Sequence, residues 1–200
     1  MNRVQRKTSP KVIGGKPQRK NYWGLTANYY NTAQSVPVID RKRPGEGYRH
    51  VLKRNDVLEF ISILPDWKEL SKGLNAIVLA PGDPWVYGYH RRGVVHVCAW
   101  DEGLWLTLTA SGYEQERTFI EKAGVPTEKK KDRFLCKFTE STARAHQLLA
   151  TLLHELGHHH DRMTTNSKSR PSRGEPYAEE YAKDYAEQIW DSYIETFGLF

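Results

Sequence analysis

Two histidines and a glutamate occupy a metal-binding spacing in the last quarter of the chain, where the sequence is His154-Glu155-Leu156-Gly157-His158. On a helix, side chains four residues apart lie one above the other with Cβ atoms about 5–6 Å apart, so both imidazoles can converge on one ion at about 2.0–2.1 Å. Glu155 projects about a quarter turn away, where it can accept a proton from a metal-bound water. The pattern therefore predicts a zinc site with Glu155 as general base.

The next three residues, His159, His160 and Asp161, point far round the helix from this pair. We interpret them as polar residues of a helix end, because histidines interact favourably there with the backbone carbonyl dipoles. Contacts that orient the metal ligands are the alternative interpretation. We expect none of the three to bind the metal.

A catalytic zinc ion takes three protein ligands and keeps one open position, so a third ligand must come from another segment. Glu175, Glu179 and Glu180 follow in a second predicted helix. On a helix Glu175 and Glu179 lie about 40° apart, on a face with small alanines that permits close helix packing. Glu180 lies about 140° from Glu175, on what we expect to be the solvated side. Helical geometry favours Glu175 and Glu179.

The helix that must carry the two histidines is predicted over residues 139–163, beginning at a Thr139 or Ser141 cap. Regular α-helical periodicity groups on one side Ala145, Leu148, Leu149, Leu152 and Leu156. The other side carries Gln147, Ala150, Thr151, His154 and His158. The leucine side predicts core packing, which leaves the histidines facing away from the core.

The glutamates are predicted to lie on a helix over residues 172–198, after a polar loop that contains proline. A capping box of Ser172 and Glu175 is a candidate start for this helix.

The preceding residues, 21–138, contain an irregular aromatic segment and then short helices and strands. A helix or helix pair interrupted by Pro65 is predicted first. The predicted strands are 75–80, 85–90, 94–100, 104–109 and 133–138, with a short helix over 113–124. A Gly-containing turn at 91–93 joins two of the strands as a hairpin. These elements predict an α+β fold, a small mainly antiparallel or mixed sheet packed on the histidine helix.

Charge is concentrated at the N-terminus of a chain whose net charge is +6. Residues 1–20 contain seven basic residues and no acid, which predicts a flexible basic arm ahead of one domain over residues 21–200. Electrostatic contact with nucleic acid is one role for this arm, and a solvated tail is the interpretation we favour. No signal sequence or membrane span is indicated, so we expect a cytoplasmic protein, and Cys98 and Cys136 are expected to be reduced core thiols.

The HExxH motif followed by a glutamate helix resembles the gluzincin clan of zinc metallopeptidases, and the short connection resembles its compact members, the minigluzincins. Glu175-Pro176-Tyr177-Ala178-Glu179 is similar to the E-x-x-A-E motif of anthrax-lethal-factor-type peptidases. That match implies Glu175 as third ligand and Glu179 as its supporting partner. A rival register, similar to phage-repressor-cleaving peptidases, begins at Glu179 but places Lys183 where those proteins have Asn or Asp. We therefore rank Glu175 first, Glu179 second and Glu180 last.

The resemblance implies a zincin-like fold in which an edge strand along the cleft pairs with an extended peptide substrate. The hairpin over 85–100 and the strand over 104–109 are both candidates for that edge. The expected function is zinc-dependent hydrolysis of peptide bonds in a protein or peptide substrate. The alternatives are a non-proteolytic zinc-binding regulatory module, a basic nucleic-acid-binding protein, and a zinc hydrolase of non-peptide amides.

Overall fold

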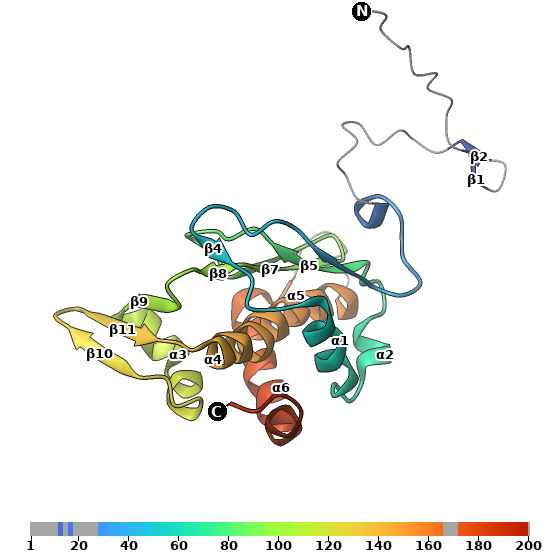
Figure 1. The fold of residues 1–200 in the computed structure, drawn as a ribbon. Helices are drawn as coiled ribbons and strands as arrows, with labels where there is room; N and C mark the ends of the chain where they lie inside the picture. Colours follow the sequence, from blue (N-terminus) through green and yellow to red (C-terminus); the bar gives the residue numbers. More distant parts are fainter. Residues whose placement is uncertain (1–11, 14–15, 18–27, 166–171, 200) are drawn as a thin grey trace, which may run out of the picture.

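The computed structural model describes residues 12–13, 16–17, 28–165 and 172–199, which form an α+β fold (Figure 1). Within the basic arm it describes only strand β1 (Val12–Ile13), which pairs antiparallel with β2 (Lys16–Pro17). The rest of the arm predicted over residues 1–20 lies outside the described residues. In the described parts of the chain, no helix combines the length and the apolarity that a bilayer crossing needs.

The main sheet has four strands in the order β3-β5-β7-β6. They are β3 (Val38–Arg41), β5 (Ala76–Ala80), β7 (Val94–Cys98) and β6 (Gly88–Arg91). The pairs β3–β5 and β5–β7 are parallel, and only β6 runs antiparallel to its neighbour. The main sheet is therefore mixed, one of the two arrangements expected from the sequence, and not mainly antiparallel. Every residue of β5 and β7 is buried, as is typical of parallel strands covered on both faces.

The predicted hairpin is confirmed as β6 and β7. Arg91 pairs with Val94, so the loop between the strands is Arg92-Gly93. Both loop residues have positive φ, 50° and 79°, as a two-residue type I′ turn requires. The turn fixes which side chains of β6 face the helices, and this strand borders the site described below.

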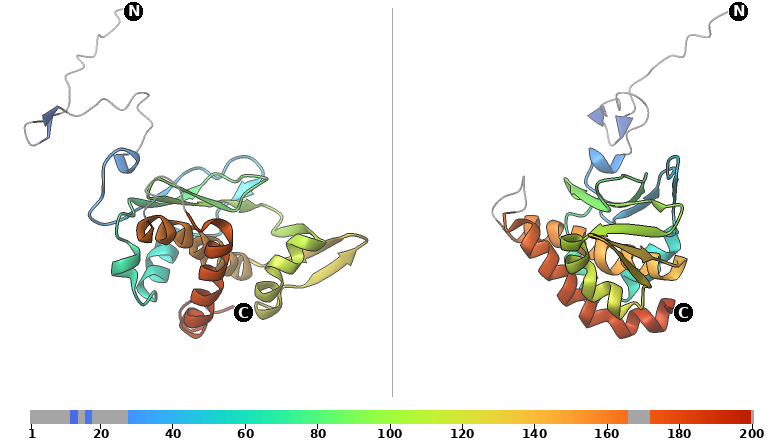
Figure 2. Two further views of the ribbon diagram at one scale, coloured as in Figure 1. Left: turned by 180° about the vertical axis from the view of Figure 1, so that it is seen from behind. Right: turned by 90° about the vertical axis from the view of Figure 1, so that its left-hand side faces the viewer.

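The helices lie against one face of the main sheet (Figures 1 and 2). They are α1 (Arg54–Ser62), α2 (Trp67–Leu70), α4 (Glu140–Ala145), the π-helical segment η2 (His146–Leu152), α5 (Leu153–Thr164) and α6 (Gly174–Phe197). The buried leucines of η2 and α5 join Phe60, Ile77 and Tyr193 in the largest apolar core. The 3-10 turn η1 (Asn28–Tyr30) covers the opposite face, where Tyr29 packs on Val78.

A smaller lobe lies at one end of the main sheet (Figure 1). It contains α3 (Ala110–Lys122) and the antiparallel strands β10 (Thr127–Lys130), β11 (Arg133–Lys137) and β9 (Trp105–Thr109). The short strands β4 (Tyr48–Arg49) and β8 (Trp100–Asp101) form a separate antiparallel pair. Phe119 and Trp190 pack against both this lobe and the main core. Cys98 and Cys136 are buried free thiols.

The predicted histidine helix is continuous from the Thr139 cap, whose hydroxyl accepts the Thr142 amide, but η2 interrupts its α-helical period. In a regular α-helix Gln147 would lie about 20° from His154 and His146 about 80° away. One additional residue in a π-turn moves Gln147 to about 120° and His146 to about 20°. Gln147 accordingly donates to the Cys98 carbonyl at 2.6 Å instead of sharing the histidine face, so its predicted position is wrong.

Candidate metal centre

Helices α5 and α6 approach each other closely at Gly157, one of the two unspecified positions of the motif. A Cβ atom at Gly157 would lie 3.0 Å from the Cα atom of Ala178 and 3.2 Å from its carbonyl oxygen. A larger residue at either position would separate the helices. The small pair therefore brings the first turn of α6, which carries Glu175, over the histidines of α5.

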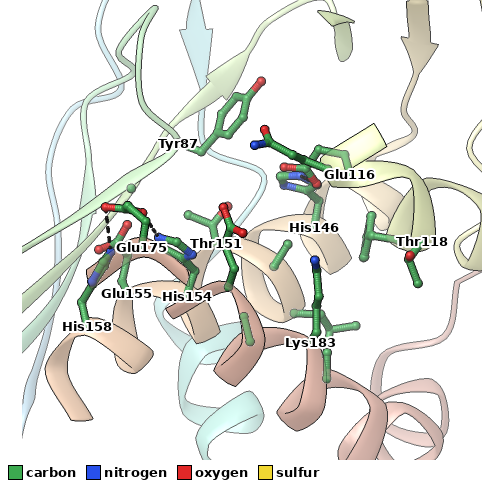
Figure 3. A pocket seen from close by; sticks show the side chains of 18 of the residues that line it. Tyr87, Glu116, Thr118, His146, Thr151, His154, Glu155, His158, Glu175 and Lys183 are labelled. Atoms are coloured by element: carbon green, nitrogen blue, oxygen red, sulfur yellow. Dashed lines mark hydrogen bonds and ion pairs between the residues drawn. The ribbon is translucent and has the colours of Figure 1, made fainter. Parts of the chain in front are cut away.

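His154, His158 and Glu175 converge on one point (Figure 3). The Nε2 atoms of His154 and His158 lie 3.1 and 3.3 Å from the two carboxylate oxygens of Glu175. The three ligand atoms all lie within 4.8 Å of one another, so small side-chain rotations would bring each to the distance at which zinc binds nitrogen and oxygen, about 2.0–2.2 Å. Two imidazoles and a carboxylate form a donor set typical of a catalytic zinc site.

The protonation state of His154 suits a ligand. Its burial and the neighbouring His158 lower the pKa of His154, and they outweigh the opposing effect of Glu175. The neutral ring is therefore favoured, and only a neutral imidazole offers a lone pair to an ion.

Glu155 lies beside the cluster on α5 but is not part of it. Its side chain is buried, and its Oε2 atom has no hydrogen-bond partner among the described residues. Burial and the charge of Glu175 raise the pKa of Glu155 to about 8. A buried carboxyl oxygen without a partner costs free energy, so its presence calls for a functional explanation. A carboxyl group that exchanges a proton near neutral pH suits acid–base chemistry.

The edge strand β6 passes directly over Glu155. A Cβ atom at Gly88 would lie 3.0 Å from the Glu155 Cγ, 2.7 Å from the Thr151 Cγ2 and 2.8 Å from the His96 carbonyl oxygen. Only glycine permits this approach. The hairpin over 85–100 and the strand over 104–109 were both predicted as candidate borders of the cleft. Strand β6 of the hairpin and the residues just before it line the pocket, whereas β9 does not.

The three candidate carboxylates on α6 occupy different positions. Glu175 belongs to the cluster, whereas Glu179 lines the pocket without joining it. Glu180 is exposed and does not line the pocket. The positions follow the order ranked from the sequence.

His159 and His160 point away from the cluster, as expected. The His159 Nε2 atom lies 2.9 Å from the Lys72 carbonyl oxygen. The His160 Nδ1 atom lies 2.6 Å from the hydroxyl of Tyr177. Both rings therefore hold neighbouring segments against α5.

Asp161 has a structural role that the sequence analysis missed. Its buried carboxylate accepts the backbone amides of Arg173 and Gly174 at 2.8 and 3.2 Å, and the Arg173 Nε atom at 2.9 Å. Burial opposes ionisation, but these hydrogen bonds outweigh it and lower the pKa of Asp161. Asp161 thereby holds the N-terminus of α6, one residue before Glu175, against α5.

The Ser172/Glu175 capping box is accordingly wrong. Helix α6 begins at Gly174, and its N-cap residue, Arg173, makes no side-chain capping bond. The amides are satisfied instead by Asp161, twelve residues earlier on another helix. Local sequence carries no signal for a cap that is supplied across a loop.

The cluster lies at one end of a pocket of about 640 Å³ between β6, α3, η2, α5 and α6. At the other end the His146 Nε2 atom lies 3.1 Å from a carboxylate oxygen of Glu116 (Figure 3). Neither residue follows from the sequence pattern, because the π-helical segment turns His146 toward the pocket and tertiary packing brings α3 to it. No family model matches the chain, and neither a curated protein nor a solved structure is similar to it.

Proposed function

We propose that this chain is a zinc-dependent metallopeptidase in which His154, His158 and Glu175 hold the metal and Glu155 is the general base. The observation that supports this most directly is the convergence of three ligand atoms from two helices, within 4.8 Å of one another. A zincin-like fold, resembling the gluzincins, is part of the same proposal. Its support is the order of the elements, a sheet on the motif helix followed by the glutamate helix.

The residues present fit a zinc ion. The donor set contains two imidazoles and one carboxylate. Three protein ligands leave one coordination position of a zinc ion for solvent or substrate. Glu155 is adjacent to His154 in the chain but is not among the ligands, and its Oε2 atom has no hydrogen-bond partner within the described residues. A purely structural site would be closed by a fourth protein ligand and would need no buried carboxyl group next to it.

A bound zinc ion would lower the pKa of its water toward about 7 and polarise the substrate carbonyl. Glu155 would take a proton from the water whose oxygen bonds to the amide carbon, and would return it to the amine nitrogen as the C–N bond breaks. Its burial keeps bulk water from competing for that proton. His154, His158 and Glu175 position the centre, and Asp161 fixes the helix that carries Glu175.

The strand β6 suits an extended peptide. It is the last strand in the order β3-β5-β7-β6, so one of its edges has no neighbouring strand within the described residues. Backbone groups on such an edge can pair with an added chain. Trp85, Tyr87 and Tyr89 are exposed along the same segment and offer surface for substrate side chains.

The test compares the purified chain with its Glu155→Gln variant by metal analysis and by cleavage of a mixed peptide library. The proposal expects about one zinc per chain in both proteins, with cleavage by the unmodified protein only. General-base loss costs about 10²- to 10⁴-fold in rate. Zinc without any cleavage would favour a regulatory zinc-binding module, cleavage of simple amides alone would favour a non-peptide hydrolase, and absence of zinc would reject the metal centre.

A further inference from the structure

The end of the pocket opposite the metal centre contains a carboxylate with a free oxygen. One oxygen of Glu116 accepts from His146, and no hydrogen bond to the other oxygen is found among the described residues. The Glu116 side chain lines the pocket and is 25% exposed. Burial raises the pKa of this carboxyl group, but the charge and hydrogen bond of His146 outweigh it, and the net direction is downward. Glu116 is therefore a fixed acceptor of hydrogen bonds.

His146 contacts Glu116 from a buried position. Its ring is 1% exposed and its Nδ1 atom has no partner among the described residues. A carboxylate can only accept, so the Nε2 atom carries the proton. This hydrogen bond uses one oxygen of Glu116 and leaves the other able to accept from a ligand.

Apolar side chains also line this pocket. Leu149, Phe119 and Trp190 line the pocket together with small alanines of α6. A hydrocarbon chain several atoms long can lie along such walls, with its polar end at the carboxylate. The side chains of lysine and arginine combine such a hydrocarbon stem with a cationic end.

We infer that the Glu116 end of the pocket is a specificity subsite for the arginine or lysine side chain of a peptide substrate. This inference rests on the proposed function, and it assigns the substrate class of the same site. The aliphatic stem would pack on the apolar wall, and the cationic end would donate to the free oxygen of Glu116.

Lys183 is a basic side chain of the protein itself that lies near Glu116, so it carries the same charge as the inferred substrate side chain. It projects from α6 toward Glu116 and His146 (Figure 3), and its charge contributes to the lowered pKa of Glu116. Its side chain is exposed, and among the described residues no ion pair holds it. A substrate cation would displace the Lys183 ammonium group from the vicinity of Glu116.

The experiment measures binding of acetyl-arginine-amide to the full chain after zinc removal by a chelator, using calorimetry. Glu116→Gln, which keeps an acceptor for His146, should weaken binding about tenfold or more. Lys183→Met should tighten it, because a like charge is removed. Glu187→Gln is the matched control. It makes the same charge change in the pocket lining, but at an exposed residue already paired with Lys122, so it should change binding by less than about twofold.

Three outcomes would overturn the inference: no binding of the arginine probe, equal weakening by Glu116→Gln and Glu187→Gln, or preference for acetyl-glutamate-amide that Lys183→Met abolishes. Cleavage separates this result from the proposed function. Peptides that differ only by arginine or norleucine should be cleaved unequally, and Glu116→Gln should remove the difference. Cleavage without that preference would overturn the subsite alone. Probe binding through Glu116 without any cleavage would overturn the peptidase and keep the cation site.

Discussion

Both ends of the pocket place a glutamate against histidine, yet they suit different chemistry. At the metal centre the Glu175 side chain is 72% exposed and faces two partly buried imidazoles, His154 and His158. At the other end the Glu116 side chain is 25% exposed and faces a single imidazole, His146, which is 1% exposed. One end offers three converging lone pairs, and the other offers a fixed negative charge.

The difference shows that residue type alone does not define a site. An ion needs several acceptor atoms that point at one place and are accessible to it. At the Glu116 end a single imidazole, that of His146, faces the carboxylate, and the described residues there form no group of three ligand atoms. On the two proposals above, the same two residue types would bind a metal ion directly in one case and select a cationic side chain in the other.

The largest expected effect tests whether only one end binds metal. Glu175→Gln should weaken zinc binding by about 100-fold or more, since it removes one of three ligands. His146→Ala and Glu116→Gln should leave zinc affinity unchanged. Competition with a chromogenic chelator measures all three. Equal losses at the two ends would erase the distinction, and a larger loss for Glu179→Gln or Glu180→Gln than for Glu175→Gln would assign a different third ligand.

Asp161→Asn should affect the metal end alone, and less severely. An amide cannot accept all three donors from Arg173 and Gly174, so the start of α6 loosens and Glu175 loses its fixed position. We expect zinc affinity to fall about 10- to 100-fold and the free energy of unfolding to fall by about 2–3 kcal/mol. Urea denaturation and chelator competition measure these changes. Unaltered zinc affinity in a destabilised variant would limit Asp161 to a stabilising role.

Gly88→Ala should disturb β6 where it passes over Glu155. The added Cβ would contact Thr151, Glu155 and the His96 carbonyl, so we expect a loss of about 1–3 kcal/mol in the free energy of unfolding. Peptide cleavage should fall because β6 moves away from Glu155. Thermal unfolding measures the first effect, and steady-state kinetics the second. Gly124→Ala is the comparison variant. Its Cβ would contact no atom within 4 Å, but its φ of 64° is strained for alanine, so it measures backbone strain without a steric clash.

The smallest expected effect concerns acid stability at the Glu116 end. His146 lowers the pKa of Glu116 in the folded chain against the effect of burial. A lowered folded-state pKa contributes stability that is fully present above the unfolded value, near 4.3, and is lost as pH falls through the folded value. The difference in unfolding free energy between the unmodified chain and Glu116→Gln should therefore shrink from pH 6 to pH 3. A pH-independent difference in urea titrations would contradict this linkage.

Sequence patterns predicted a large part of this arrangement. The i, i+4 spacing of His154 and His158 requires only a helix, and the β6–β7 hairpin follows from a short turn with glycine. The continuous apolar runs of β5 and β7 are also typical of buried parallel strands, whereas the sequence was interpreted as a mainly antiparallel or mixed sheet. The parallel pairing depends on which strands become neighbours, and that is decided by packing.

The sequence by itself determined which residues on α5 share a face, because helical periodicity is a local property of the backbone. Only the tertiary structure decided that Glu175 completes the cluster, since this depends on the contact of Gly157 with Ala178 and on a helix start held by Asp161. It also decided that His146 faces the pocket with Glu116, because a π-helical segment changes the period there. Contacts between distant segments are set by the burial of whole faces, for which no short motif carries the information.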